Sequence, residues 1–151
     1  MRLTFWKLSQ GTEYFSRSDI SSSIEQRLVY VHLDTPAKGQ SVVTQAENFI
    51  QAEIGDYFYL THGNRGICLL GQFTGPVNVF SSKGDGWADR PFRIIRLANS
   101  NIGYEGPNKW WAPNHRSTFV QVPETEVEEF EQHILEPFFD ISLVDYGVEI
   151  V

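Results

Sequence analysis

The sequence predicts an α+β domain in which a few helices flank a small, curled sheet. Three observations support this: short apolar stretches recur with the period of a strand, few segments have helical spacing, and two long loops carry aromatic residues. With 151 residues, the chain has the length of a single domain with a substantial core, 1–151. The pattern alone fits an open sheet and a barrel equally well.

The first part of the chain is predicted to alternate strand, helix and strand. Residues 3–9 ("LTFWKLS") form a strand, and 16–28 begins with Ser and Asp residues that cap helices. In the strand 27–34 ("RLVYVHLD"), Tyr30 and His32 share one face and the aliphatic residues between them share the other.

The next segment, 41–54, has mixed signals. Val42, Ala46, Phe49 and Ile50 have helical spacing, whereas the Val-Val-Thr start is typical of a strand. A helix is the preferred prediction here.

A hairpin follows, in the stretch "IGDYFYLTHGNRGICLLGQFTGP". Its strands are 56–62 and 66–73, and Gly-Pro ends the second. Its turn contains His62, Asn64 and Arg65, which is the composition of either a solvated turn or the rim of a site.

The second half is predicted to contain two loops, two strands and one helix. The loops are 80–91 and 99–117, which hold three of the four tryptophans, and the strands are 92–98 and 118–122. Residues 123–139 form the clearest helix, because Pro and Glu residues suit its first turns and its apolar residues form one stripe.

The negative net charge of −7 belongs to one segment. Residues 123–151 contain nine acidic residues and no Lys or Arg, whereas 83–116 contain six basic and three acidic residues. A basic middle of this size fits a module that contacts a short stretch of nucleic-acid backbone.

No catalytic or metal-binding pattern stands out, so no catalytic residue, metal or cofactor is predicted. HExxH, CxxC, GxGxxG and phosphate-loop motifs do not occur. The single cysteine, Cys68, lies in the apolar stretch "GICLLG", where cysteine packs as a small hydrophobic residue. An enzyme or small-molecule site built on His62 and Cys68 is the alternative.

The N-terminus lacks the pattern of a signal peptide, and no apolar stretch is long enough to span a bilayer. With one cysteine and no disulfide, the sequence predicts a cytoplasmic protein that does not bind membranes.

Aromatic and basic residues recur together in the loops. Trp87 follows "KGDG", and Trp110 and Trp111 lie between Lys109 and Arg116. Stacking of bases and neutralisation of phosphates need this combination.

Four motifs occur in one order: "FWKLS", "LVYVH", "GDYFYLTHGNRGICLLGQFTGPV" and "GWADRPFRIIRL". Together they resemble the EVE/YTH group of the PUA-like superfamily, above all the EVE-like domains at the N-termini of McrB-type modification-dependent restriction proteins. The resemblance covers most of the chain. It implies a PUA-like (EVE/YTH) pseudobarrel of about six strands flanked by helices, which reads one modified base.

The resemblance also implies a cage for that base. Tyr30 lies where YTH proteins place a cage tryptophan, and Trp87 where the second one comes. Trp6, Ser9 and His32 complete the expected cage. A rim of polar, basic and aromatic side chains is expected to meet the nucleic-acid backbone: Lys7, His62, Asn64, Arg65, Lys109, Trp110 and Arg116.

The predicted function is binding without catalysis. The domain is expected to flip a methylated base, 5-methylcytosine first of all, out of double-stranded DNA, and to target an attached or partner McrB-type GTPase motor and nuclease. On this interpretation the chain is free-standing or the N-terminal module of a longer protein. The alternatives are a YTH-like reader of N6-methyladenine in RNA or DNA, a PUA-like domain that binds a small molecule, and a protein-interaction module that uses the acidic helix 123–139.

Overall fold

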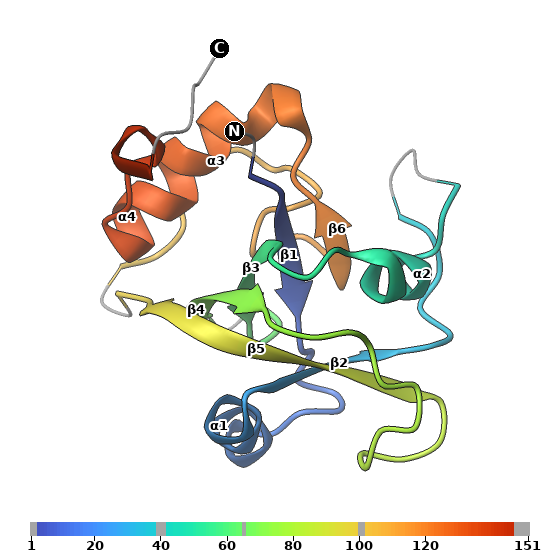
Figure 1. Ribbon diagram of the computed structural model, residues 1–151. Coiled ribbons are helices and arrows are strands. Elements are labelled where there is room, and N and C mark those ends of the chain that lie inside the picture. Colours follow the sequence, from blue (N-terminus) through green and yellow to red (C-terminus); the bar gives the residue numbers. More distant parts are fainter. Residues whose placement is uncertain (1–2, 39–41, 65, 100–101, 147–151) are drawn as a thin grey trace.

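The computed structural model describes residues 3–38, 42–64, 66–99 and 102–146. Six strands form one curled sheet with helices around it (Figure 1). The strands are β1 (Phe5–Ser9), β2 (Leu28–His32), β3 (Tyr57–Thr61), β4 (Ile67–Phe73), β5 (Trp87–Leu97) and β6 (Phe119–Gln121). The α-helices are α1 (Arg17–Gln26), α2 (Gln45–Gln51), α3 (Val127–Phe130) and α4 (Glu136–Phe139). A π-helical turn, Glu131–Leu135, joins α3 to α4, and 3₁₀ turns occupy Glu124–Glu126 and Leu143–Tyr146.

The strand order is β2-β5-β4-β3-β1-β6, so β2 and β6 are the edges. β1 and β3 pair in parallel, and the other neighbours pair antiparallel. Helix α2 contacts both edge strands and therefore lies at the opening between them. The sheet is thus a barrel-like structure that a helix, rather than a strand pair, completes. This confirms the predicted α+β class with six strands flanked by helices.

Alternation along the strands separates an inner core from two outer ones. Val29 and Val31 of β2 pack in the inner core with Phe58, Phe92 and residues of α2. Tyr30 points the other way, into a small cluster beneath α1. A third cluster fills the space between the sheet and the helices α3 and α4. The predicted two faces of 27–34 are therefore confirmed.

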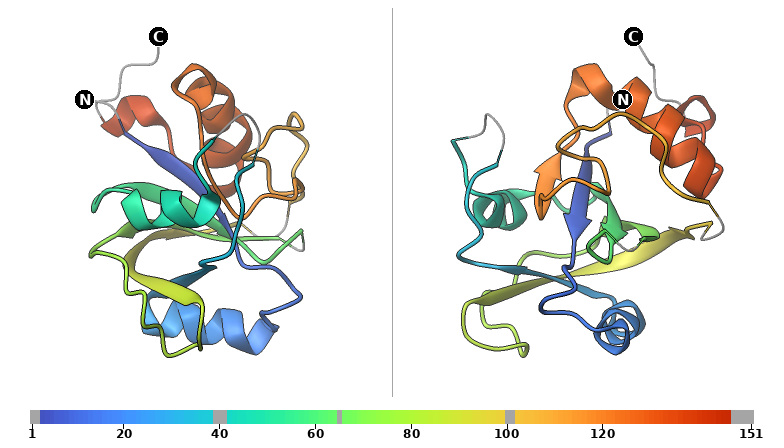
Figure 2. Two further views of the ribbon diagram at one scale, coloured as in Figure 1. Left: turned by 90° about the vertical axis from the view of Figure 1, so that its right-hand side faces the viewer. Right: turned by 180° about the vertical axis from the view of Figure 1, so that it is seen from behind.

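The two ends of the molecule differ in their elements. Figure 2 shows α1 at one end and α3 with α4 at the other, in both views. Among the described residues no helix has the length and apolar character needed to cross a bilayer.

Three sequence predictions need correction. Strand β5 begins at Trp87, so this tryptophan lies on a strand and not in the predicted loop 80–91. Val42, expected on a helix face, is 96% exposed, because α2 starts only after its cap, Thr44. The predicted helix 123–139 is interrupted by the π-helical turn just before Pro137, whose nitrogen has no hydrogen to donate to the preceding turn.

Candidate functional site

Three aromatic side chains meet between α1, β2 and the start of β5. Tyr30 comes from the middle of β2, Trp87 opens β5, and Phe15 directly precedes Ser16, the cap of α1. The Phe15 ring centroid lies 6.2 Å from that of Tyr30 and 5.5 Å from that of Trp87, with the Phe15 and Trp87 rings perpendicular at 88°. We call these three side chains the aromatic cage.

Local structure positions each member of the cage. The register of β2 and β5 pairs His32 with Trp87 and Tyr30 with Asp89, so Tyr30 and Trp87 are diagonal neighbours on one face of the sheet. The hydroxyl of Ser16 accepts a hydrogen bond from the Asp19 amide, and the Asp19 carboxylate accepts one from the Ser16 amide. This capping box fixes the start of α1 and thereby holds Phe15 against the sheet.

Other polar and aromatic groups surround the cage. The His32 ring lies 4.9 Å from that of Trp87 and perpendicular to it, and the Tyr14 ring contacts Trp87 edge-on at 5.6 Å. Burial, and then the charge of Asp89, raise the pKa of Tyr30. Its hydroxyl therefore keeps its hydrogen at neutral pH and can donate it to a ligand.

A cation of the chain itself lies over the cage. Lys83 Nζ is 4.1 Å from the ring centroid of Phe15, 4.9 Å from that of Trp87 and 5.9 Å from that of Tyr30. These distances lie within the range of cation–π attraction. Neither Phe15 nor Lys83 was predicted from the sequence as a site residue. The available signals were the position of Phe15 before a helix cap and that of Lys83 in the "KGDGW" stretch.

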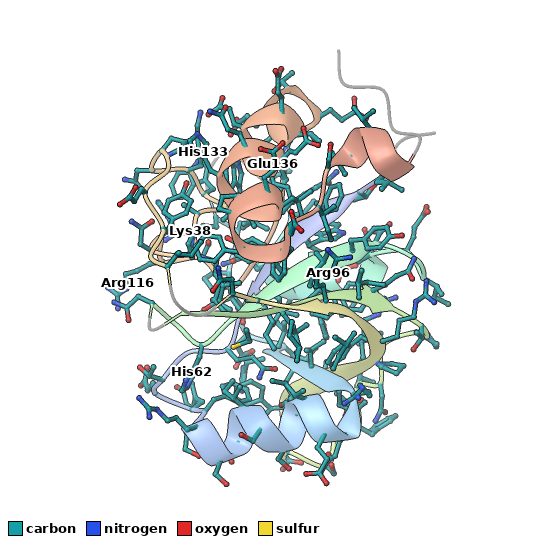
Figure 3. The ribbon with its side chains drawn as sticks, turned by 90° about the vertical axis from the view of Figure 1, so that its left-hand side faces the viewer. Lys38, His62, Arg96, Arg116, His133 and Glu136 are labelled. Atoms are coloured by element: carbon teal, nitrogen blue, oxygen red, sulfur yellow. The ribbon has the colours of Figure 1, made fainter. Side chains whose placement is uncertain are left out.

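The turn of the β3–β4 hairpin lies beside the cage. His62 is buried, and its Nε2 is 2.6 Å from the carbonyl oxygen of Phe15, so this nitrogen carries the hydrogen. The Gly63 amide donates to the carbonyl of Gln10, which lies with Phe15 in the segment between β1 and α1. Asn64 is exposed at the tip, and Arg65 lies outside the described residues. Figure 3 shows His62 close to the start of α1.

The structure does not bring Trp6 to the cage. Its indole stacks on Phe119 in the inner core, with centroids 4.5 Å apart and planes 12° apart, and its Nε1 donates to the Asp56 carboxylate. Trp6 therefore lies apart from the aromatic cage, because its side chain is buried in the inner core.

Lys7 and Ser9 lie on the opposite face of β1 from Trp6, as strand alternation requires. Lys7 is fully buried, and its Nζ donates to the His115 carbonyl at 2.7 Å and to the Ser117 hydroxyl at 2.8 Å. Ser9 pairs with Thr61 of β3 and its amide donates to the Thr118 carbonyl. These two residues belong to the region of the 110–118 loop and not to the aromatic cage.

The basic residues of that loop differ in their surroundings. Lys109 Nζ lies 3.6 Å from a carboxylate oxygen of Glu126 and 3.8 Å from one of Glu129, so the acidic helix offsets its charge. Trp110 is 46% exposed and its ring lies 4.4 Å from that of His115. Arg116 is exposed. Trp111, in contrast, is buried in the core beside Phe130.

The geometry disfavours a Cys–His catalytic pair. Nε2 of His62 is engaged by the Phe15 carbonyl. Burial raises the pKa of Cys68 to about 11, so the thiol stays protonated at neutral pH and is a poor nucleophile. Among the residues that the structure describes, no three or more His, Cys, Asp or Glu side chains come together as a metal site. A surface depression between the 102–106 loop and α4, lined by His133 and Phe138 among others, lies at the other end of the molecule from α1.

No family model and no curated protein matches the chain. Among solved structures, it is similar to the protein PSPTO5229 from Pseudomonas syringae, with 15% identity over 66% of this chain and 72% of that one, at a TM-score of 0.38. It is also similar to human THYN1, solved in complex with DNA that contains 5-methylcytosine, with 15% identity over 85% of this chain and 75% of that one, at a TM-score of 0.36. A protein from Leishmania major gives a TM-score of 0.35 at 17% identity, over 62% of this chain and 66% of that one. These likenesses are distant, and what the chain binds has to follow from its own residues.

Proposed function

We propose that this protein binds a methylated base, 5-methylcytosine in double-stranded DNA in the first place, by holding the flipped base in the aromatic cage. The observation that carries the proposal is the meeting of Phe15, Tyr30 and Trp87 beside the hairpin turn. A cage of this kind offers a base both an aromatic surface for stacking and an apolar wall for its methyl group.

The energies are compatible with flipping. Taking one base out of the duplex costs a few kcal/mol. Stacking on an aromatic side chain returns ~1–3 kcal/mol per base. The Tyr30 hydroxyl can add a hydrogen bond to a ring edge, and a buried methyl group adds about 0.8 kcal/mol. The methyl contribution is what would distinguish the modified base from cytosine.

In this proposal the domain recognises DNA and catalyses nothing. An attached or partner GTPase motor and nuclease of the McrB type would supply cleavage, which the sequence resemblance supports. The exposed side chains Asn64, Trp110 and Arg116 are proposed to meet the DNA backbone, together with Arg65.

Fluorescence anisotropy tests the proposal on three duplexes that differ at one base: 5-methylcytosine, cytosine, and N6-methyladenine in place of adenine. We expect the 5-methylcytosine duplex to bind about three- to fourfold more tightly than the unmodified one, because the methyl group is worth about 0.8 kcal/mol. Tyr30→Ala and Trp87→Ala should abolish this ratio.

Trp110→Ala is the matched control, since it removes an exposed tryptophan outside the cage. It should lower both affinities and keep their ratio. Equal binding of methylated and unmodified duplexes by the unaltered protein would refute the proposal, and preference for N6-methyladenine would change the base that it names.

A further inference from the structure

We propose that Lys83 is a ligand of the aromatic cage supplied by the protein's own chain, and that an outside ligand enters the cage by displacing its ammonium group. The step that concerns DNA rests on the proposed function. Occupancy of the cage by Lys83 does not.

The ammonium group has the contacts of a bound cation. Its nitrogen lies at 4.1 Å from the Phe15 centroid and at 4.9 Å from the Trp87 centroid, so two perpendicular rings hold it from two sides. Tyr30 adds a third ring at 5.9 Å. Phe15 and Tyr30 are buried, so water is largely excluded from these faces and the attraction is stronger than at an open surface.

With Lys83 in place, the cage has no slot for a base. A flat base between two parallel rings needs a centroid separation of about 7 Å, twice the carbon contact distance of about 3.5 Å. Phe15 and Trp87 are 5.5 Å apart and perpendicular, and the edge of Tyr14 also contacts Trp87. Entry of a base therefore requires both rotation of a ring and departure of the lysine.

Two glycines shape the turn that carries Lys83. Gly84 and Gly86 follow it with φ of 139° and 82°, conformations that glycine adopts without strain. Outside the rings, Nζ of Lys83 has one described hydrogen bond, a long one of 3.4 Å to the Tyr14 carbonyl. Once displaced, the ammonium would lie beside the flipped base, where it can pair with a phosphate.

Tetramethylammonium is a probe of the cage that involves no nucleic acid. We expect the Lys83→Ala variant to bind it about twofold to thirtyfold more tightly than the unaltered protein, because the competing intramolecular cation is gone. Adding Trp87→Ala should remove this binding. Lys38→Ala, which removes a lysine that lies over Trp110 instead, should leave the affinity for tetramethylammonium unchanged. Equal affinities of the unaltered protein and Lys83→Ala would overturn the inference.

NMR observes the lysine directly. The ε-methylene protons of Lys83 should resonate upfield in the free protein, since they lie over aromatic rings, and should return to ordinary values when a 5-methylcytosine duplex binds. If the duplex binds with methyl preference and the Lys83 signals do not move, displacement is wrong and the proposed function stands. If methylated and unmodified duplexes bind equally well, the proposed function fails. The tetramethylammonium titration then still decides whether Lys83 occupies the cage.

Discussion

Lys7 is a fully buried lysine whose described hydrogen bonds go to neutral acceptors, the His115 carbonyl and the Ser117 hydroxyl. Burial, and then the nearby charge of Lys38, lower the pKa of Lys7 to about 7. The sequence resemblance expected Lys7 at a rim that contacts DNA. Its buried ammonium group instead connects β1 to the 110–118 loop through these two hydrogen bonds.

Stability should depend on the protonation of Lys7. The folded pKa is about 7 and the unfolded one about 10.5, so between these values the unfolded chain binds more protons and stability rises with pH. From pH 7 to pH 8.5 the gain is about 1–2 kcal/mol. Ionisation of Cys68 would oppose the gain at higher pH, because the thiol loses its proton more easily in the unfolded chain than in the fold. The window therefore ends below the ordinary thiol pKa of 9.0.

Urea unfolding at pH 7.0, 7.5, 8.0 and 8.5 measures this gain. Lys7→Met, which keeps the length and loses the charge, should flatten the dependence, whereas Lys109→Met, at a partly exposed and ion-paired lysine, should retain it. A slope that survives in Lys7→Met would show that another group titrates.

The alternation of side chains was sufficient to predict the orientation of Tyr30, because polar residues flank the apolar stretch of its strand at both ends. The same rule limits what could be predicted for the first strand. Trp6 and Lys7 are adjacent, so they lie on opposite faces and cannot serve one cage together. Phe15 and Lys83 were missed, since their local signals do not show that the helix cap, the strand and the loop meet in space.

At the scale of elements, Gln45 links α2 to the edge strand β6. Gln45 is buried, and its Oε1 accepts hydrogen bonds from the amides of Thr118 and Phe119 at 2.6 and 2.9 Å. Its Nε2 donates to the Pro36 carbonyl at 3.0 Å. Gln45 therefore satisfies the first amide of β6 and the amide before it, and β6 is an edge strand of the sheet.

Gln45→Leu should destabilise the fold by about 2–4 kcal/mol, because it leaves the amides of Thr118 and Phe119 without their acceptor. Gln51→Leu is the matched control, since Gln51 is exposed on the same helix and should change stability by less than about 0.5 kcal/mol. Urea unfolding compares the two variants. Similar losses in both would mean that the apolar contacts of α2, and not Gln45, hold it at the opening.

The elements whose signals are local were predicted well: the β3–β4 hairpin, β2 and the start of α1. The start of β5 was not, because "GWADRP" has the composition of a loop and becomes a strand by pairing with the distant β2. Likewise, the alternation of apolar and polar residues predicted the strands of the sheet, but it did not predict that α2 would lie at the opening between the edge strands.

At the scale of the whole molecule, the net charge of −7 must be reconciled with binding to DNA. The acidic helices α3 and α4 lie at the opposite end from α1, which borders the cage (Figures 1 and 2). A chain of this length has a radius of gyration of about 15 Å. The two ends are thus about 30 Å apart, whereas the screening length at 0.15 M salt is about 8 Å. The acidic end should hardly affect the flipped base at the cage, whereas DNA backbone that reaches Trp110 would lie near Glu126 and Glu129, whose charges Lys109 offsets.

Two neutralising variants test this separation. The double variant Glu128→Gln/Glu136→Gln removes two exposed carboxylates at the acidic end, and we expect it to change the affinity for a methylated duplex by less than about twofold at 0.15 M salt. Arg17→Gln removes an exposed cation two residues after Phe15, and it should weaken the binding of methylated and unmodified duplexes by the same factor. It should also reduce the slope of log affinity against log salt concentration by up to about 0.9. If the acidic pair matters more than Arg17, then DNA approaches the α3–α4 end, and the aromatic cage cannot be where its base is held.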